Sequence, residues 1–402
     1  MSQKVFIVGA KRSPIGSFLG ALKDVHPVEL GTQVLRGLLR DTKVPVDKID
    51  EVIIGNVLSA GVGQGIARQI SVKAGIPVEV PAYSLNMLCG SGMKSVINAF
   101  VSIQSGISQL IVAGGVESMS QAPYLMPAKS REGFKMGDFS IVDHMLTDGL
   151  TDAFDKVHMG ITAENIASKH QIPRLEQEQF ALASQEKAIK SVDAGVFDGE
   201  IVPIEIKTRK ETIIFSRDEF PNRTTSMDKM AKLRPAFKPD GVVTAATSSG
   251  INDGASFILL ASEEAVKNYH LTVLAELIGI GQGAVEPNVM GLGPVPAIRH
   301  ALDFAHLKLN QIDLIELNEA FAAQSIGVVK ELSQEHHMLE SQLYSIINPN
   351  GGAIALGHPI GASGNRIIVS LIYEMIRSKK HTGLASLCIG GGMGTAVIAK
   401  LV

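Results

Sequence analysis

The stretch KIDEVIIGNV, residues 48–57, has a later counterpart in NQIDLIELNEA, residues 310–320. In each stretch the pair Ile-Asp precedes a short apolar run, and the run ends at an asparagine, Asn56 or Asn318. Short apolar runs bounded by polar residues are typical of buried strands. The chain therefore repeats one structural unit, and this repeat is the strongest indication of its fold.

The segments that follow the two stretches are also alike. LCGSGMKSVINAFVSIQSG (88–106) precedes the strand-like QLIVAGG (109–115), and GHPIGASGNRIIVSLIYEMI (357–376) precedes LASLCIGGG (384–392). Apolar residues at helical spacing predict a helix in each: Met93, Val96, Ile97, Phe100 and Ile103, and then Ile367, Ile368, Leu371, Ile372, Met375 and Ile376. Strands that alternate with helices form βαβ units, so we expect an α/β protein whose two similar halves pack as layers.

The chain between the halves differs from them in composition. From about Ser118 to Ser249 the periodicity weakens, and only the segment near Arg174 to Lys190 is clearly amphipathic. A stretch this long more often forms a lid or binding subdomain than a linker. We therefore divide the chain into an N-terminal half (1–118, completed by about 250–270), an inserted loop domain (119–249) for ligand binding and oligomer contacts, and a C-terminal half (271–402).

Composition limits the functional classes. The 402 residues are 45% hydrophobic and 19% charged, as expected of a soluble protein with a large core. The two cysteines form no C-x-x-C motif, so we expect reduced thiols in the cytoplasm. No run approaches the roughly 20 apolar residues of a membrane helix, and the start MSQKVFIVGAKRSP has too short an apolar run for a signal peptide. A formal net charge of -3 argues against nucleic-acid binding.

One segment has a local excess of positive charge. The window from Lys207 to Lys238 contains nine basic and four acidic residues, a net charge of +5. Such a patch can meet an anionic small molecule, and a solvated loop face is the alternative interpretation.

Cys89 stands directly before Gly-Ser-Gly and a predicted helix, in NMLCGSGMKS (86–95). Unpaired N–H groups and the positive end of the helix dipole lower the pKa of a thiol at such a place, from its reference of about 8.5. We therefore expect a reactive thiolate, with Gly90 and Gly92 leaving backbone amides free to hold an oxyanion. The alternative is a small buried apolar residue.

A cysteine nucleophile needs a base, and His358 is the best-placed histidine. Pro359 favours an extended backbone for it, just before the second predicted helix, which would make His358 the counterpart of Cys89. A structural histidine is the alternative. Cys388 ends a strand-like run before a turn of three glycines. Asn318 ends a predicted strand where a helix is expected to begin, so it can fix a water or carbonyl oxygen, or act as an N-cap.

Four ordered stretches together resemble the thiolase family: NMLCGSGMKS, NEAFAAQS, GHPIGASGNR and CIGGGMG. The resemblance covers essentially the whole chain and is strongest to the short-chain biosynthetic branch. It implies a five-layer αβαβα fold of two similar halves. It also implies a reversible Claisen condensation of two acetyl-CoA molecules to acetoacetyl-CoA and CoA, with CoA as substrate or product, no permanently bound cofactor and no metal.

The resemblance implies a role for each catalytic residue. Cys89 would carry the acetyl group in a ping-pong mechanism, after activation by His358. Cys388 would remove a proton from the methyl group of the second acetyl-CoA. Asn318 would hold a water that stabilises the enolate together with His358, and the amides of Cys89 and Gly390 would hold the oxyanion.

The resemblance also implies CoA contacts and a homotetramer built as a dimer of dimers. His158 and Ser249 would touch the pantetheine arm, near apolar walls from Met159, Phe237, Met290 and Phe321. Arg223 and Lys229 of the basic window would meet the phosphates, although both depart from the family's pattern. The segment from Gln121 to Gly137, with Tyr124, Leu125, Met126 and Phe134, suits a loop that reaches a neighbouring subunit.

The sequence favours three alternative functions less strongly. A degradative 3-ketoacyl-CoA thiolase runs the same chemistry on longer chains, but LCGSG and HPIGASG favour the short-chain branch. A non-catalytic CoA or lipid carrier on the same scaffold would be expected to lack a thiol or the histidine. A dinucleotide-binding oxidoreductase would need a G-x-G-x-x-G after the first strand, which is missing here.

Overall fold

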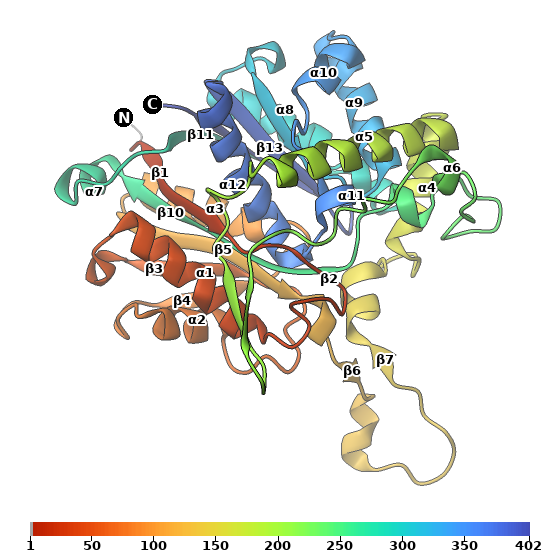
Figure 1. Cartoon of the computed structure of the whole chain (residues 1–402), viewed down its shortest axis with the longest axis horizontal. Coiled ribbons are helices and arrows are strands. Elements are labelled where there is room, and N and C mark those ends of the chain that lie inside the picture. Colours follow the sequence, from red (N-terminus) through yellow and green to blue (C-terminus); the bar gives the residue numbers. More distant parts are fainter. Residues whose placement is uncertain (1–2) are drawn as a thin grey trace.

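The chain folds into two halves whose sheets have the same topology, and the computed structural model describes residues 3–402 (Figure 1). The N-terminal sheet has the order β4 (Ala82–Leu85), β3 (Glu51–Gly55), β5 (Leu110–Ser118), β10 (Asn252–Ser262) and β1 (Val5–Arg12). The C-terminal sheet has the order β12 (Leu314–Leu317), β13 (Thr382–Ile389), β14 (Met393–Lys400) and β11 (Ala275–Ala284). β3 and β12 run parallel to β5 and β13, and the strands beyond are antiparallel. The repeat in the sequence is therefore a repeat of topology.

The two sheets meet edge to edge. Residues Val5, Phe6 and Ile7 of β1 pair antiparallel with Leu277, Glu276 and Ala275 of β11. In the N-terminal sheet β4 lies parallel beside β3. In the C-terminal sheet the equivalent position beside β12 contains a single parallel bridge, between Ile315 and Ile347. Both halves therefore have the same set of neighbours around the strand that carries the repeat.

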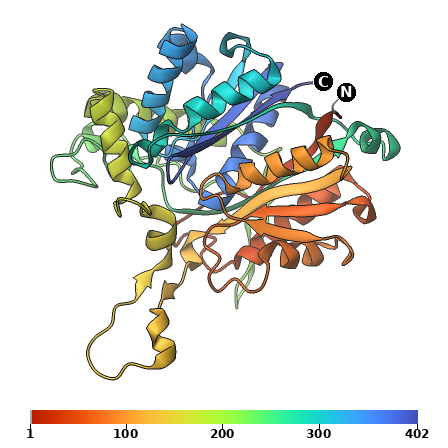
Figure 2. The ribbon, with the colours of Figure 1, turned by 180° about the vertical axis from the view of Figure 1, so that it is seen from behind.

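Helices cover the outer face of each sheet, and a central layer of helices packs between the inner faces of the two sheets. The central layer contains α3 (Ser91–Gln104) and α12 (Ile360–Ser378), and its core joins alternate residues of both sheets. The outer layers contain α1 (Pro27–Thr42) and α2 (Ile66–Ala74) on one side, and α8 (Pro294–Ala305), α9 (Ala322–His336) and α10 (Glu340–Ile346) on the other. The view from behind shows the same layers (Figure 2). The predicted five-layer αβαβα fold is confirmed.

The apolar faces predicted for the two central helices are buried, with one exception. All five positions of α3 and the first five of α12 lie in the core. Ile376 is 44% exposed, because it lies in the last turn of α12, where Arg377 and Ser378 are exposed as well.

The two central helices touch at their first turns. A Cβ atom on Gly92 would lie 2.8 Å from the backbone nitrogen of Asn365, and one on Gly364 would lie 2.6 Å from that of Met93. Only glycine allows this approach, since real Cβ atoms are not found so close to a backbone atom. The contact brings the turn before α3 beside the turn before α12.

The segment between β5 and β10 forms the inserted region, which packs chiefly on the C-terminal half. It contains α4 (Met159–Lys169), α5 (Arg174–Asp193), α6 (Met227–Met230) and the hairpin of β8 (Ile204–Lys207) and β9 (Thr212–Phe215). Short strands β6 (Tyr124–Leu125) and β7 (Val142–Asp143) pair at the base of an arm that projects from the body (Figure 1). Other short elements include β2 (Gly16–Ser17), α7 (Glu263–Asn268) and α11 (Ala353–Leu356).

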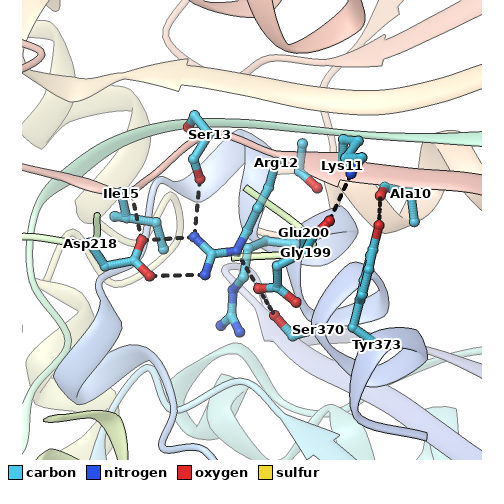
Figure 3. A network of polar contacts seen from close by, with 12 residues as sticks. Ala10, Lys11, Arg12, Ser13, Ile15, Gly199, Glu200, Asp218, Ser370 and Tyr373 are labelled. Carbon is cyan, nitrogen blue, oxygen red and sulfur yellow. Dashed lines mark hydrogen bonds and ion pairs between the residues drawn. The ribbon is translucent and has the colours of Figure 1, made fainter. Parts of the chain in front are cut away.

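A buried ion cluster ties this inserted region to both halves (Figure 3). Arg12 of β1 is fully buried, and its guanidinium forms two bonds of 2.7 and 2.9 Å to Asp218 and one of 2.5 Å to Glu200. Ser370 of α12 donates to the same glutamate at 3.1 Å. These carboxylates raise the pKa of Arg12 against the opposing effect of burial. Asp218 therefore points inward, and not every charge of the basic window is available to solvent.

Within residues 3–402, no helix is long and apolar enough to cross a membrane, and no cluster of His, Cys, Asp or Glu side chains could hold a metal ion.

Candidate active site

A cavity of about 420 Å³ brings both cysteines and His358 together. Predicted residues that line it are Cys89, His158, Met159, Phe237, Ser249, Met290, Phe321, His358, Cys388 and Gly390. One wall of the cavity is formed by an apolar cluster that packs beside Cys89. The other wall is formed by an apolar cluster that contains Cys388. Three candidate catalytic side chains from distant parts of the sequence thus share one small apolar space.

Cys89 lies on a tight turn between β4 and α3. Its neighbour Leu88 has a φ of +48°, which is uncommon for a residue with a side chain. Asn86 accepts a 2.8 Å bond from the Leu88 N–H, and Ser91 accepts a 2.9 Å bond from the Met87 N–H while donating to the Leu88 carbonyl at 2.6 Å. These local bonds hold the backbone in a strained conformation, a feature common at active sites.

The thiol of Cys89 does not have the lowered pKa that the sequence predicted. Burial among apolar walls raises its pKa to about 11, and the Glu117 carboxylate adds to this effect. Backbone hydrogen bonds from Gly390 and from Cys89 itself act in the opposite direction but are weaker. The prediction is wrong because loss of hydration outweighs the favourable amides. The thiol is therefore protonated at neutral pH and needs a base.

His358 has the protonation state and orientation of such a base. Burial and then the charge of Arg366 lower its pKa to about 3, so the imidazole is neutral. Its Nδ1 lies 2.6 Å from the Ser363 hydroxyl, which donates its own proton to the Pro359 carbonyl at 3.0 Å. Nδ1 must therefore be the N–H donor, which leaves the lone pair on Nε2. In the described part of the chain Nε2 has no partner.

Cys388 lies at the end of β13, almost fully buried. Burial raises the pKa of its thiol, and the nearby Cys89 sulfur raises it further. Two residues later comes Gly390, whose backbone N–H lowers the pKa of the Cys89 thiol and which lines the same cavity. The strand end thus places a second thiol and an amide donor beside the first thiol.

Asn318 follows β12 and is fully buried. The predicted helix begins only at Ala322, so Asn318 is not an N-cap. Neither its Oδ1 nor its Nδ2 has a hydrogen-bond partner among residues 3–402, and its side chain is not part of the cavity lining. Buried polar atoms need a partner, so this amide is suited to hold a water.

Comparison with known proteins identifies the family. Residues 5–264 match the thiolase N-terminal domain, and residues 271–401 match the thiolase C-terminal domain. The chain belongs to the thiolase family. It is therefore an acyltransferase, and the predicted family is confirmed.

Relatives resemble this thiolase over their whole length. The acetyl-CoA acetyltransferase of Pseudomonas aeruginosa is 50% identical over 396 residues, which cover 98% of either chain. The structure of acetyl-CoA acetyltransferase from Syntrophomonas wolfei is 42% identical, with a TM-score of 0.97 and coverage of 100% of both chains. Human mitochondrial 3-ketoacyl-CoA thiolase is 41% identical, with a TM-score of 0.93 and coverage of 100% of this chain and 99% of that one. Shape alone does not separate the two branches.

Two glycines of this thiolase have a different role from the one expected. The Gly90 N–H already donates to the Met87 carbonyl at 3.0 Å, and a Cβ here would overlap the Ile389 side chain. Gly92 is required for the contact between α3 and α12 described above. Both glycines therefore serve packing, and the backbone amides that lower the pKa of the Cys89 thiol are those of Gly390 and Cys89.

The side of the cavity near α4 forms an aromatic wall. His158 stacks on Phe237 with ring centroids 4.8 Å apart, and Phe237 meets Phe321 edge to face at 6.0 Å. His158 also accepts a 3.0 Å bond from the Gly160 N–H, so its ring is fixed at the start of α4. The Ser249 N–H donates at 2.9 Å to the carbonyl of Ala320, the residue before Phe321, so Ser249 is joined to the same wall. This wall suits the slender, mostly apolar arm of a CoA thioester.

The two predicted cations lie outside the cavity. Arg223 pairs with Asp193 through bonds of 2.9 and 2.6 Å, and Lys229 donates to the Thr224 carbonyl at 2.6 Å. Arg223 lines a second hollow, which shares Ala245 and Ser248 with the cavity. Lys229 lines neither hollow. The structure therefore places only Arg223 next to an extension of the cavity.

Several residues of the site were not predicted. The wall beside Cys89 is formed by Met119, Gly149, Leu150, Ile251 and Ile360. Met119 directly follows β5, which extends to Ser118, beyond the predicted strand end near Gly115. A longer predicted strand would have indicated it. Leu150 belongs to a short π-helix, Met145–Leu150, which has no signal in the sequence.

Proposed function

We propose that this thiolase is an acetyl-CoA C-acetyltransferase, which reversibly condenses two acetyl-CoA molecules to acetoacetyl-CoA and CoA. The observation that carries this proposal is the single small cavity shared by Cys89, Cys388 and the free Nε2 of His358. Relatives that carry the name acetyl-CoA acetyltransferase support it.

In the first half-reaction, His358 Nε2 accepts the proton of Cys89, and the thiolate attacks the thioester carbonyl. The amides of Cys89 and Gly390 stabilise the oxyanion. The carbon–sulfur bond to CoA then breaks, and the leaving thiolate takes the proton of Cys388. The products are acetyl-Cys89, free CoA, a Cys388 thiolate and a protonated His358.

In the second half-reaction, the Cys388 thiolate removes a proton from the methyl group of a second acetyl-CoA. Protonated His358 and a water held by Asn318 stabilise the enolate, which attacks the carbonyl of acetyl-Cys89. The Cys89 thiolate leaves and takes its proton back from His358. Because one thiol is occupied as the acyl carrier, a separate base is needed for carbon–carbon bond formation.

The remaining features complete the proposal. The pantetheine arm lies along the aromatic wall of His158, Phe237 and Phe321, and the nucleotide extends toward the second hollow beside Arg223. The enzyme acts in the cytoplasm as a homotetramer, with contacts made by the β6–β7 arm. Tyr124 and Met126 of this arm are 66% and 55% exposed, and Phe134 stacks on Phe139 at 4.1 Å. Sedimentation of the protein at micromolar concentration tests the tetramer.

A degradative activity on longer 3-ketoacyl-CoA substrates is the second candidate, because the human 3-ketoacyl-CoA thiolase has nearly the same structure. Thiolysis rates for acetoacetyl-CoA and for a longer 3-ketoacyl-CoA separate the two. A preference for the longer substrate would favour the degradative assignment.

The decisive experiment is to incubate the pure protein with acetyl-CoA and measure its intact mass. We expect an adduct of about 42 Da, the mass of an acetyl group that replaces a proton, on a peptide that contains Cys89. The Cys89→Ser variant is the control and should remain unmodified. A wild-type protein without the adduct would contradict the proposed function.

A further inference from the structure

Because the fold is duplicated, the protein contains a second set of residues in positions equivalent to those of the catalytic residues. In the C-terminal sheet Leu317 is in register with Ser386, and Cys388 lies two residues further on. In the N-terminal sheet the corresponding pair is Gly55 and Gly115.

Two residues beyond Gly115 lies Glu117. The antiparallel neighbouring strands give the same correspondence. Cys388 of β13 pairs with Gly394 of β14, and Glu117 of β5 pairs with Gly254 of β10. Glu117 is therefore the counterpart of Cys388.

The helices give the second correspondence. The mutual contacts of Gly92 and Gly364 relate α3 to α12, and three residues before each glycine lie Cys89 and Gly361. Gly361, and not His358 as the sequence suggested, is therefore the counterpart of Cys89. Asn56 and Asn318, which follow β3 and β12, correspond in the same way. Cys388, Cys89 and Asn318 thus each have an equivalent in the other half.

In the second set, the side chain of Glu117 is hydrogen-bonded to the other members and to the loop beside them. Glu117 is fully buried, and its Oε2 accepts from the N–H groups of Gly361 and Val57 at 2.9 and 3.0 Å. Its Oε1 accepts from Asn56 Nδ2 and from the Leu58 N–H, both at 3.1 Å. All four partners are donors, so the carboxyl group accepts through both oxygens. Burial raises the pKa of Glu117 to about 7, and the three backbone N–H donors oppose that rise.

We propose that Glu117 is a positioning residue of the reaction, because its carboxylate fixes the turn that carries His358 against the loop at Asn56–Leu58 and so holds His358 Nε2 toward Cys89. The inference rests on the proposed function. Gly361 lies three residues after His358 and in the first turn of α12, where backbone N–H groups lack partners within the helix. One carboxylate thus restrains the helix start on one side and the loop on the other.

Two further observations connect Glu117 to the reaction. Ile360, adjacent to Gly361, lines the cavity, and Leu58 belongs to the same apolar cluster beside Cys89. The Glu117 carboxylate also contributes to the raised pKa of the Cys89 thiol, so its charge reaches the nucleophile. A displacement of the helix start would move His358 and this wall together.

Replacement of Glu117 by glutamine tests the inference. The variant keeps the size of the side chain but turns an NH₂ group toward N–H donors, so some of the four bonds are lost. We expect kcat for acetyl-CoA condensation to fall by at least about tenfold while KM stays within about twofold. Rates are divided by the fraction of Cys89 that can be acetylated, as measured by intact mass, so that misfolded protein does not count.

Asp50→Asn is the matched control. Asp50 accepts from the backbone N–H groups of Gln109 and Leu110 at 2.6 and 2.9 Å, at the opposite ends of β3 and β5. It therefore makes similar bonds far from the cavity, and we expect kcat to stay within about twofold. Native turnover per acetylated site in Glu117→Gln, or an equal loss of kcat in Asp50→Asn, would overturn the inference.

If Glu117→Gln does not yield folded protein, Asn56→Ala removes only one of the four donors. We expect kcat to fall about threefold at unchanged KM, and no loss would overturn the inference. Failure of the wild-type protein to become acetylated would instead contradict the proposed function, so the two failures can be told apart.

Discussion

The two equivalent places of this thiolase differ in how their polar groups are paired. Beside the start of α3, Asn318 has no hydrogen-bond partner for its side chain anywhere in residues 3–402, and Cys388 is a buried thiol next to Cys89. Beside the start of α12, Glu117 accepts four hydrogen bonds, one of them from Asn56. A duplicated fold thus supplies two equivalent positions at the ends of β13 and β5. The one with unpaired groups is available to a substrate, and the one with paired groups holds the first in position.

The largest effect is expected from the nucleophile. Cys89→Ser should lose acetylation and lower the condensation rate by more than about 10³-fold, because a hydroxyl buried in this cavity is a far weaker nucleophile than a thiolate. Intact mass after incubation with acetyl-CoA and a condensation assay measure this. Retained turnover would place the nucleophile elsewhere and remove the distinction between the two places.

A smaller loss is expected at Cys388. Cys388→Ser should still become acetylated, but its condensation rate should fall by at least about 10²-fold, because the pKa of a hydroxyl is too high for the proton transfer. Exchange of the acetyl-CoA methyl protons in deuterated solvent should slow by a similar factor. Condensation near the wild-type rate would contradict the role of Cys388 as the base.

The pH dependence of alkylation tests the surroundings of Cys89. Because its pKa is raised to about 11, the thiolate fraction of the free enzyme grows with pH throughout the neutral range. The rate of modification by iodoacetamide should therefore rise about tenfold per pH unit between about pH 6 and 9. A plateau near neutral pH would show a lowered pKa, as the sequence alone suggested. Cys89→Ser corrects for reaction elsewhere.

The two asparagines provide the finest comparison. Asn318→Ala should lower the condensation rate about tenfold, less than loss of a direct oxyanion donor, since it acts through a water. Its stability should hardly change, because no bond within the described chain is lost. Asn56→Ala should instead lower the free energy of unfolding by about 1–3 kcal/mol, because it removes one of the four donors to Glu117 and the side-chain donor to the Val116 carbonyl. Urea unfolding measures both, and equal losses of stability would contradict the difference in pairing.

Local patterns predicted the two α/β halves and the glycine turns that carry the two cysteines, whereas the five layers and the residues expected to contact CoA came from the family resemblance. Most of the predicted residues line the cavity. The repeat at Asn56 and Asn318 marks equivalent strand ends, and glycine turns mark where α3 and α12 begin. What could not be predicted depends on distant contacts. The pKa of Cys89 is set by walls from several segments, and Arg223 is held by Asp193, 30 positions away.

Glu117 illustrates the same limit. It is one acidic residue at the end of an apolar strand, and only the fold shows that its partners are Gly361 and the loop after β3. The exposure of Ile376 likewise depends on where α12 leaves the core. A spacing rule gives the face of a helix but not the point at which that face becomes exposed to water.

The order of strands in the N-terminal sheet also has a consequence for synthesis. β10 (Asn252–Ser262) lies between β1 and β5, so the sheet can be completed only after the whole inserted region has been made. At the usual 5–20 residues per second, β1 leaves the ribosome roughly 12–50 s before its partner exists. During that time β1 and β5 offer unpaired edges, which are sites of misassociation. The C-terminal strands β11 to β14 all lie within residues 275–400, a shorter span of chain, so the first half is the one whose folding in the cell is most exposed to delay.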